Sequence, residues 1–370
     1  MWLPGLSEHG GIARHNRSFC KAVSEYAREH DASVEVVSLR DPDRYFDPSF
    51  LTQPVVGCEG RSRRFGLAAL SSLAAGFDLL VVGVADFGPL VPAARLRCPS
   101  APILTIVHGI EVWKSLSPLT RTALTQVTAI VAVSDYTAAA VTERHGVEAS
   151  RIHVIPPPLE PGFLQGAGSD TNVPVASRLL SISRLNRIDA PKGVERVIEA
   201  LPTVRARIPD VDYVVVGEGD DRDRLQDLAK RLGVDELTTF KGAVSDAELH
   251  SYLRATDLFV LPSAKEGFGI VFLEAGAYEK AVVGGNHGGT PEVVLDGVTG
   301  ALVDATDVPG LAGAISELLL DDERRAEMGR RAAERVRDCY GYELFQERVG
   351  GVLEQLLDHA SAGRRALSIR

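Results

Sequence analysis

The sequence predicts an α/β protein built from two doubly wound domains, in which helices cover both faces of a parallel sheet. Short runs of β-branched residues, such as "DLLVVGV", "PILTIVHG", "DYVVVGEG" and "LFVLPS", are apolar throughout, as expected for strands buried on both faces. Ala- and Leu-rich helical stretches separate these runs along most of the chain. A segment rich in Pro, Gly and small polar residues interrupts the alternation, so the two series belong to different domains.

The interrupting segment, "IPPPLEPGF" followed by "LQGAGSDTNVPV", predicts a domain boundary near residue 165. A chain of 370 residues also corresponds to two or three domains at roughly 150 residues each. We therefore expect a first domain over 1–165, a second over 166–338, and a C-terminal helical segment over 339–370. Two amphipathic helices should meet near Tyr340-Gly341, and the basic tail should fray.

The start of the chain leaves little room for a first strand. Only Met1 to Pro4 precede the loop "GLSEHGGIAR", which we expect to lead into a helix from about Gly11 to Arg28. In a doubly wound sheet the strand before that turn is usually central. We therefore expect this strand to be short or missing, or the natural start to lie upstream of Met1.

Composition and charge exclude several classes of protein. Hydrophobic residues make up 45% and charged residues 24%, which is ordinary for a globular chain. The formal net charge of -10 excludes general nucleic-acid binding, which needs a basic face. The four cysteines form neither a CxxC pair nor a disulfide framework, and the start lacks the features of a signal peptide. We therefore expect a cytoplasmic protein.

A carboxylate in an apolar helix is the first sign of a ligand site. In "EGFGIVFLEAGA", Glu274 stands among apolar residues, and an unpaired buried carboxylate is costly, so it requires a protein cation or a ligand as its partner. Gly267 and Gly269 would open the helix N-terminus to a phosphate, although glycine also serves tight turns. Glu266 lies eight residues before Glu274. Two acids that flank a phosphate suit a ligand with hydroxyls at both ends, such as a nucleotide sugar.

Two basic residues complete the candidate site. In "SISRLNRIDAPKGVERVIEAL", Arg184 follows a strand and Lys192 precedes a helix. Both therefore belong to a loop at the carboxyl end of the sheet, where α/β proteins bind ligands. Arg184 could clamp phosphate oxygens with two hydrogen bonds while Lys192 supplies a point charge. A solvated pair of surface charges is the alternative, and the nearby pair of glutamates weakens it.

These motifs, in their order and spacing, resemble the donor half of retaining glycosyltransferases of family 4. The resemblance rests on "SRL…KG", "VVGEGDDRDRL", "FKGAVSDAEL", "EGFGIVFLEAGA" and "GGTPEVV"; it covers roughly residues 178 to 304 and is looser in the first half. It implies the GT-B fold, in which two Rossmann-like domains face each other across a cleft. It also implies that the C-terminal helix crosses back to the first domain.

The resemblance implies a role for each matching residue of the second half. Arg184 and Lys192 would hold the donor diphosphate, and Glu266 would bind the hydroxyls of the transferred sugar. Glu274 would bind the ribose hydroxyls. The remaining donor-binding residues of this half would be Gly242 and Val244 beside the base, and Gly267, Phe268, Gly269 and Ile270 along the phosphate and sugar.

Two motifs of the first half also match the family. "EHGGIAR" matches its glycine loop, which would place Gly10 and Gly11 near the donor phosphate. "TIVHGIEVW" matches its strand-end histidine, which would place His108 beside the reacting sugar. A hydrogen-bonded histidine at a sheet edge is the alternative for His108. The family often has Asn-Gly after the proline of the next strand, whereas this chain reads "IPPPLEP", so no contact is carried over there.

The implied reaction is transfer of a hexose from a UDP- or GDP-sugar to a glycan or lipid-linked acceptor, with retention of anomeric configuration. Because no side chain is an obvious nucleophile, we expect the departing phosphate to accept the acceptor's proton while the basic residues and the helix N-terminus stabilise its charge. The alternatives are a nucleotide-sugar epimerase, a phosphorylase, or a non-catalytic nucleotide-sugar sensor.

We expect neither a cofactor nor an essential metal. "GEGDDR" begins like a dinucleotide-binding loop, but Arg222 stands where the last glycine is needed. The D-x-D pairs lie at turns and helix starts, where Asp is favoured for capping. These pairs are Asp41 with Asp43, Asp210 with Asp212, and Asp221 with Asp223.

The stretch "GRSRRFGLAALSSLAAGF" joins Arg61, Arg63 and Arg64 to an apolar helix. Such a sequence is compatible with peripheral contact with the inner face of a membrane, since many acceptors in the family are lipid-linked. An ordinary core helix with a solvated end is the alternative.

Overall fold

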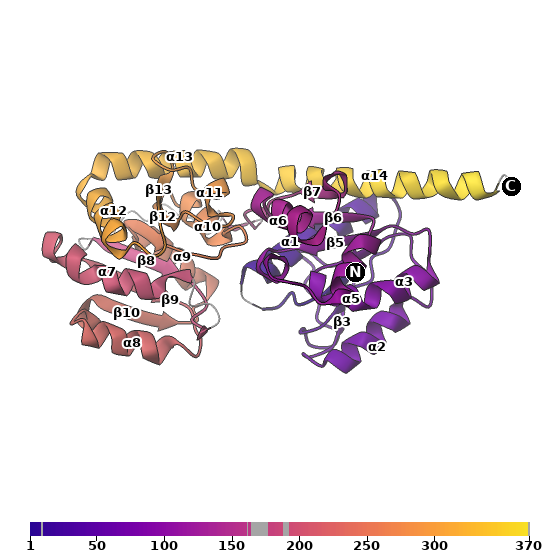
Figure 1. Cartoon of the computed structure of the whole chain (residues 1–370), viewed down its shortest axis with the longest axis horizontal. Helices are drawn as coiled ribbons and strands as arrows, with labels where there is room; N and C mark the ends of the chain where they lie inside the picture. Colours follow the sequence, from indigo (N-terminus) through magenta and orange to yellow (C-terminus); the bar gives the residue numbers. More distant parts are fainter. Residues whose placement is uncertain (9, 161, 164–176, 188–191, 369–370) are drawn as a thin grey trace. The chain divides into compact units, whose positions relative to one another are not determined.

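The structure is a computed structural model that describes residues 1–8, 10–160, 162–163, 177–187 and 192–368 (Figure 1). The chain forms two compact units. The first contains Met1–Glu160 together with Tyr342–Arg370, and the second contains Pro161–Gly341. Residue 165, where the sequence predicts the domain boundary, lies outside the described residues.

The first unit is built on a parallel sheet in the order β3-β2-β1-β4-β5-β6-β7. Its longest strand is fully buried, as its apolar sequence predicts. The strands are β1 (Trp2–Leu3), β2 (Val37–Ser38), β3 (Val56–Gly57), β4 (Leu80–Val82), β5 (Ile103–Val107), β6 (Ala129–Ala132) and β7 (Ile152–Val154).

The first strand is present and central despite its length. β1 has two residues, both buried, and pairs in parallel with β2 on one side and β4 on the other. Trp2 and Leu3 are among the largest fully buried side chains of the described residues. Two residues are enough here because backbone pairing and these two side chains anchor the strand from both sides.

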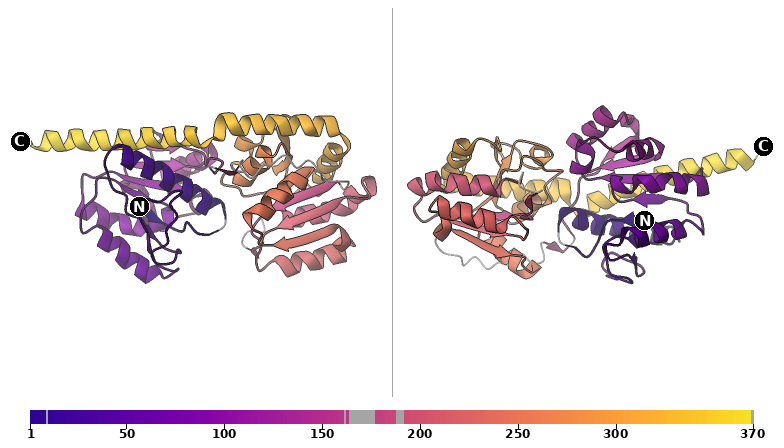
Figure 2. Two further views of the ribbon diagram at one scale, coloured as in Figure 1. Left: turned by 180° about the vertical axis from the view of Figure 1, so that it is seen from behind. Right: turned by 60° about the horizontal axis from the view of Figure 1, so that its bottom comes forward.

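Helices cover the first sheet, and one of them comes from the end of the chain. They are α1 (Gly11–Glu29), α2 (Ser62–Ser72), α3 (Val91–Arg97), α4 (Ile110–Trp113), α5 (Pro118–Gln126), α6 (Asp135–His145) and α14 (Tyr342–Ser368), with 3-10 turns η1 (Ala85–Leu90) and η2 (Ala149–Arg151). α14 lies beside α1 (Figures 1 and 2). Phe345, Val349 and Leu353 of α14 join Phe19 and Val23 of α1 in one buried cluster, so burial of apolar surface fixes α14 on this unit.

The second unit repeats the architecture with a parallel sheet in the order β10-β9-β8-β11-β12-β13. Helices lie on both sides of this sheet (Figures 1 and 2). The strands are β8 (Arg178–Ile182), β9 (Asp212–Val216), β10 (Thr238–Gly242), β11 (Leu258–Leu261), β12 (Ala281–Gly285) and β13 (Gly300–Val303). The helices are α7 (Val194–Arg207), α8 (Arg222–Arg231), α9 (Asp246–Ala255), α10 (Ile270–Ala277), α11 (Thr290–Val293), α12 (Val308–Leu320) and α13 (Asp322–Tyr340), with the 3-10 turn η5 (Asp235–Leu237).

The break between the last two helices falls at Gly341, where the sequence predicts that they meet. The expected start of the C-terminal segment, residue 339, lies inside α13, which continues to Tyr340. Gly341 has an extended backbone, with φ -66° and ψ 151°, and this conformation ends α13 before α14 begins.

Both sheets reverse their strand order at one point, between β1 and β4 in the first unit and between β8 and β11 in the second. Loops that leave the carboxyl ends of the two strands at such a point turn to opposite faces of the sheet, and the crevice between them is where open α/β sheets bind ligands. The candidate residues follow these strands and their neighbours.

Candidate active site

The loop after β8, Ser183–Asn186, lies directly against the loop after β9. The amides of Ser183 and Leu185 donate to the carbonyls of Val216 and Glu218, at 3.0 and 2.7 Å. A Cβ on Gly217 would lie 1.9 Å from the Ser183 carbonyl oxygen, and one on Gly219 would lie 2.2 Å from that of Leu185. The glycines of "GEG" thus permit close approach of two backbones, which accounts for them without a dinucleotide.

Arg184 and Lys192 line one pocket, although the second follows the first by eight residues. The pocket also contains Ser183, Asn186, Glu195 and Arg224. Lys192 directly precedes Gly193, which caps α7 with φ 89°, and a Cβ there would lie 2.4 Å from the carbonyl oxygen of Pro262. This close contact fixes the start of α7 beside the loop that follows β11.

Lys192 and Glu266 form an ion pair within this part of the site. Nζ of Lys192 lies 2.6 Å from Oε2 of Glu266, and the two side chains are 21% and 12% exposed. A mostly buried carboxylate next to a helix start needs such a cation, and a ligand with phosphate and hydroxyl groups could use both partners. The sequence assigned the two residues to different parts of a ligand; the structure brings their side chains together.

The loop Ser263–Gly269 leads from β11 into α10 and is buried over most of its length. Gly269 caps α10 with φ 101°, and a Cβ there would lie 2.4 Å from the ring of Phe272. As in any helix, the first amides of α10 have no intrahelical acceptor, so they can donate to an anion. Ile270 begins the helix and is 8% exposed.

A second glycine pair, Gly288 and Gly289, packs closely against the backbone of this loop. The amide of Gly289 donates to the carbonyl of Glu266 at 2.8 Å. A Cβ on Gly288 would lie 2.3 Å from the Glu266 carbonyl oxygen, and one on Gly289 would lie 2.4 Å from that of Gly267. Phe268 packs edge-on against Tyr340, with ring centroids 5.4 Å apart. Only the backbone of Phe268 is therefore suited to contact a ligand.

Glu274 lies one turn inside α10 and is 2% exposed. It follows Ile270 by four residues and so lies on the same side of the helix. Burial of this carboxylate is as the apolar helix sequence predicts.

The loop Gly242–Val244 follows β10 at the edge of the same sheet. Gly242 has φ 74°, and its carbonyl accepts a hydrogen bond from the amide of Gly217 at 2.9 Å. Gly242 is buried and Val244 is half-buried. The loop then ends at Ser245, which caps α9 together with Glu248.

A charged network lies beneath the loop Ser183–Asn186. The amide of the buried Asp221 donates to the carbonyl of Leu185, and its carboxylate accepts two hydrogen bonds from Arg224 at 2.6 and 2.7 Å. Arg224 also reaches Glu195 of α7 at 2.8 Å. The hydrogen bonds to Asp221, and then those to Glu195, raise the pKa of Arg224 above its usual value. This network joins the starts of α7 and α8 to the loop, a role that the D-x-D pattern did not suggest.

In the first unit, the loop after β1 is held by the carboxylate of Asp41. Asp41 is fully buried and accepts hydrogen bonds from the amides of Leu6 and Ser7 at 2.9 and 2.7 Å. Gly10 then caps α1 with φ 129°, and a Cβ there would meet open space. Gly11 is exposed. The glycine loop is therefore open to a ligand at its tip and fixed at its base.

His108 follows β5 and is fixed by two contacts. Its Nε2 lies 2.9 Å from the carbonyl oxygen of Gly83, which follows β4, and its amide donates to the carboxylate of Glu111. The side chain is half-buried. Both contacts come from loops at the carboxyl end of the first sheet, next to its switch point.

Several carboxylates of the D-x-D pairs make contacts within the protein. Asp41 serves the glycine loop, Asp43 pairs with Arg64 at 3.0 Å, and Asp212 pairs with Arg178 at 2.7 Å. Within the described residues, no group of three or more His, Cys, Asp or Glu side chains could hold a metal ion.

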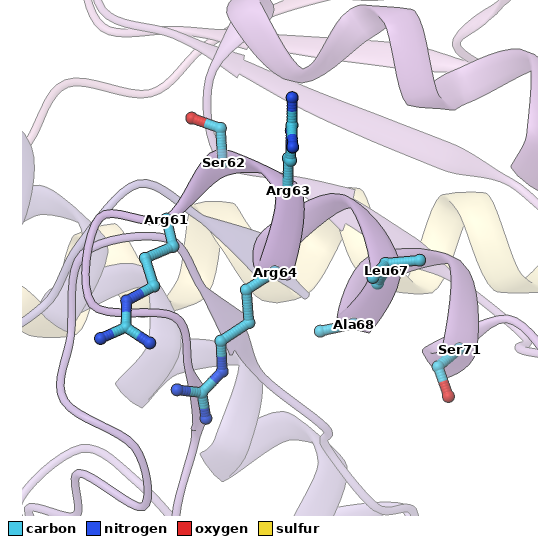
Figure 3. Close-up of a pocket in the computed structure, with 7 residues that line it drawn as sticks. All are labelled: Arg61, Ser62, Arg63, Arg64, Leu67, Ala68 and Ser71. Atoms are coloured by element: carbon cyan, nitrogen blue, oxygen red, sulfur yellow. The ribbon is translucent and has the colours of Figure 1, made fainter.

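The start of α2 carries the three arginines that the sequence singled out. Arg61 and Arg64 extend to the same side, and Arg63 extends to the opposite side (Figure 3). Arg61 pairs with Glu59 at 3.2 Å, and Arg64 pairs with Asp43 at 3.0 Å. Arg63 is exposed and forms no ion pair with another described residue. Among the residues described, no helix has the length and hydropathy needed to cross a bilayer.

Comparison with known proteins identifies the family. Residues 9–163 match the profile of Glycosyltransferase Family 4, and residues 178–335 match that of Glycosyl transferases group 1. A GDP-mannose-dependent alpha-(1-6)-phosphatidylinositol monomannoside mannosyltransferase from Mycolicibacterium smegmatis is 31% identical over 351 residues, which cover 86% of this chain and 88% of that protein. The chain belongs to glycosyltransferase family 4. This confirms the resemblance that the sequence motifs indicate.

A further relative and two solved structures are similar to this glycosyltransferase. A GDP-mannose-dependent monoacylated alpha-(1-6)-phosphatidylinositol monomannoside mannosyltransferase from Corynebacterium glutamicum is 30% identical over 72% of this chain and 75% of its own. Among solved structures, sucrose-phosphate synthase from Thermosynechococcus elongatus superposes with a TM-score of 0.75 at 20% identity, over 96% of each chain. Anabaena Alr3699/HepE in complex with UDP-glucose gives the same score and identity, over 96% of this chain and 98% of that one. At this identity the structures confirm the GT-B fold and no more.

Proposed function

We propose that this glycosyltransferase moves a hexose from a nucleotide-diphosphate sugar to a lipid-linked or glycan acceptor with retention of anomeric configuration. The observation that carries the proposal is the Lys192–Glu266 ion pair at the start of α10. It places a cation and a carboxylate beside the amides of a helix N-terminus, as a sugar diphosphate requires.

The proposal assigns each residue of the donor site a contact. Arg184, Lys192 and the first amides of α10 hold the diphosphate, Glu266 binds hydroxyls of the transferred hexose, and Glu274 binds the ribose. The loop Gly242–Val244 borders the base, and the backbone of Gly267, Phe268, Gly269 and Ile270 follows the phosphate and sugar. In the first unit, Gly10 and Gly11 approach the phosphate and His108 approaches the hexose.

The reaction then needs no enzyme nucleophile. The bond between the anomeric carbon and the phosphate oxygen breaks, and the acceptor oxygen bonds to the anomeric carbon on the same face. The leaving phosphate oxygen takes the acceptor's proton. Lys192, Arg184 and the α10 amides stabilise the charge that grows on the phosphate, which is the largest contribution such a site can make.

We propose GDP-mannose as the donor, because two relatives that align with more than 70% of this chain are GDP-mannose-dependent mannosyltransferases. A ligand that binds only the folded state raises the melting temperature, so GDP-mannose should raise it more than UDP-glucose or UDP-N-acetylglucosamine at equal concentration. With a phosphatidylinositol mannoside as acceptor, NMR should then show an α-linked product from the α-linked donor. A β-linked product would contradict retention.

Incubation with the donor alone separates the alternatives. An epimerase would change the sugar of the donor without an acceptor, whereas a sensor would bind the donor and leave it intact even when an acceptor is present. Transfer that requires an acceptor excludes both.

We also propose that the protein meets a membrane surface through α2, where its lipid-linked acceptor would lie. Only Phe65 and Ala69 of this helix are buried, whereas Leu67 and Leu70 are 72% and 44% exposed. An ordinary core helix would bury both leucines. Glu59 and Asp43 offset Arg61 and Arg64, so Arg63 is the arginine best suited to contact anionic lipid.

Vesicle co-sedimentation tests this surface. The protein should bind vesicles containing phosphatidylinositol more tightly than pure phosphatidylcholine, and Arg63→Glu should weaken binding roughly fivefold or more, since a basic residue near an anionic surface contributes about 1 kcal/mol. Leu67→Ser should also weaken binding, whereas Leu232→Ser, on the second unit, should not. Equal binding by all variants would contradict the assignment of α2.

A further inference from the structure

A second histidine, His15, contacts His108 in the first unit. His15 is on α1 and is 1% exposed, and its Nδ1 lies 3.5 Å from Nδ1 of His108. The two rings meet edge to face with centroids 5.3 Å apart. The glycine-loop motif "EHGGIAR" ends one residue before His15, so the motif gives it no role.

The contact with Gly83 decides which nitrogen of His108 carries a proton. A carbonyl oxygen only accepts hydrogen bonds, so Nε2 of His108, 2.9 Å from that oxygen, must be the donor. In the neutral ring the other nitrogen, Nδ1, is then an acceptor. Nδ1 of His15 faces it and must therefore carry the proton between them. The hydrogen bond is long, at the upper limit for this type.

The surroundings of His15 favour this arrangement. Its ring lies edge-on to Phe19 of α1 and Phe345 of α14, with centroids 6.0 and 5.7 Å away. Its Nε2 is buried and has no hydrogen-bond partner among the described residues. Burial, and then the neighbouring His108, holds the pKa of His15 well below its usual 6.5, so the ring is neutral at physiological pH. A neutral ring with its single proton on Nδ1 leaves a bare acceptor, rather than an orphaned N–H, in the apolar pocket.

We propose that His15 is a positioning residue: it donates its Nδ1–H to His108 and so holds that imidazole in one tautomer and one orientation, with Nε2 toward Gly83. The effect of His15 on catalysis rests on the proposed function, in which His108 approaches the transferred hexose. A fixed imidazole presents the same face to the sugar in every encounter, which is what orientation contributes to a rate.

The packing around His15 suggests a matched set of variants. His15→Phe keeps a ring between Phe19 and Phe345 and removes both nitrogens. His15→Asn places an amide nitrogen at about the position of Nδ1. Phe19→Leu disturbs the same apolar pocket and leaves both histidines in place.

With GDP-mannose as donor, His15→Phe should lower kcat roughly tenfold or more and change the KM for donor by less than about twofold, because His108 is misplaced while the diphosphate site is intact. His15→Asn should recover part of this loss, and Phe19→Leu should keep most of kcat. A loss in Phe19→Leu equal to that in His15→Phe, or a normal kcat in His15→Phe, would overturn the proposal.

A second readout needs no turnover. Long-range 15N–1H NMR of the histidine rings, with His108 assigned by its absence in His108→Gln, should show Nε2 of His108 protonated and Nδ1 as an acceptor. In His15→Phe the Nδ1 resonance should move toward that of an unbonded ring nitrogen. Identical His108 resonances in the two proteins would overturn the proposal. This result stands even if the wild-type protein transfers no sugar, in which case the proposed function fails and the placement of His108 by His15 is still decided.

Discussion

Lys192 and Glu266 show how the charge of a site is balanced before a ligand enters. Each residue alone would be costly to bury near a helix start, and the ion pair at 2.6 Å offsets this cost. Asp221 and Arg224, which also line this pocket, form a second ion pair of the same kind. The sequence located Lys192, Glu266 and Arg184 by their motifs, but it could not show that two of them pair, since they are 74 residues apart.

His15 makes stability depend on pH in a way that can be measured. The pKa of His15 is lowered in the folded state. As pH falls, the unfolded chain therefore takes up a proton at His15 at a higher pH than the folded protein does. The stability that comes from keeping His15 neutral is therefore complete above the unfolded value of 6.5 and is lost as pH falls toward the folded value. The loss is at most ~1.4 kcal/mol per pH unit.

Urea unfolding of the wild-type protein and of His15→Phe tests this dependence. Between about pH 8 and about pH 5.5 the free energy of unfolding should fall more in the wild-type protein than in His15→Phe, which lacks the titrating ring. Parallel pH profiles would show that His15 is not the group responsible.

At the scale of elements, glycines determine where loops meet. Gly217, Gly219, Gly288 and Gly289 each stand where a side chain would strike the backbone of a neighbouring loop. The sequence placed these residues in motifs but could not assign the contacts, because close approach of two backbones depends on which strands are neighbours in the sheet.

Alanine substitutions at two glycines with positive φ distinguish the cost of backbone strain from the cost of a steric clash. At Gly233, with φ 66° and open space around a Cβ, alanine should cost only about 1–2 kcal/mol of stability for the left-handed conformation. Gly217→Ala adds a clash with Ser183, so it should cost about 3 kcal/mol or more. Denaturant unfolding measures both. Equal losses would mean that the loops after β8 and β9 move apart easily, contrary to the close packing described.

For the whole molecule, the sequence predicted the α/β class correctly, because continuous apolar strands and helical segments alternate through the chain. The GT-B fold was implied by the resemblance of the second-half motifs to glycosyltransferase family 4. Two features lay beyond the sequence. β1 is too short for any periodic signal, and His15 becomes informative only when the fold brings α1 beside β5. Local patterns predict elements, whereas these features depend on contacts between distant segments.

The most direct test of the account is hexose transfer from GDP-mannose to a phosphatidylinositol mannoside by the wild-type protein, Lys192→Ala and Glu266→Gln, with Lys230→Ala as an exposed lysine control. The two site variants should lose ~100-fold or more in kcat/KM, as expected when a charge-stabilising group is removed. Both site variants should still unfold cooperatively, at melting temperatures lowered by the loss of the ion pair. Lys230→Ala should transfer normally. Near-normal transfer by both site variants would contradict the account.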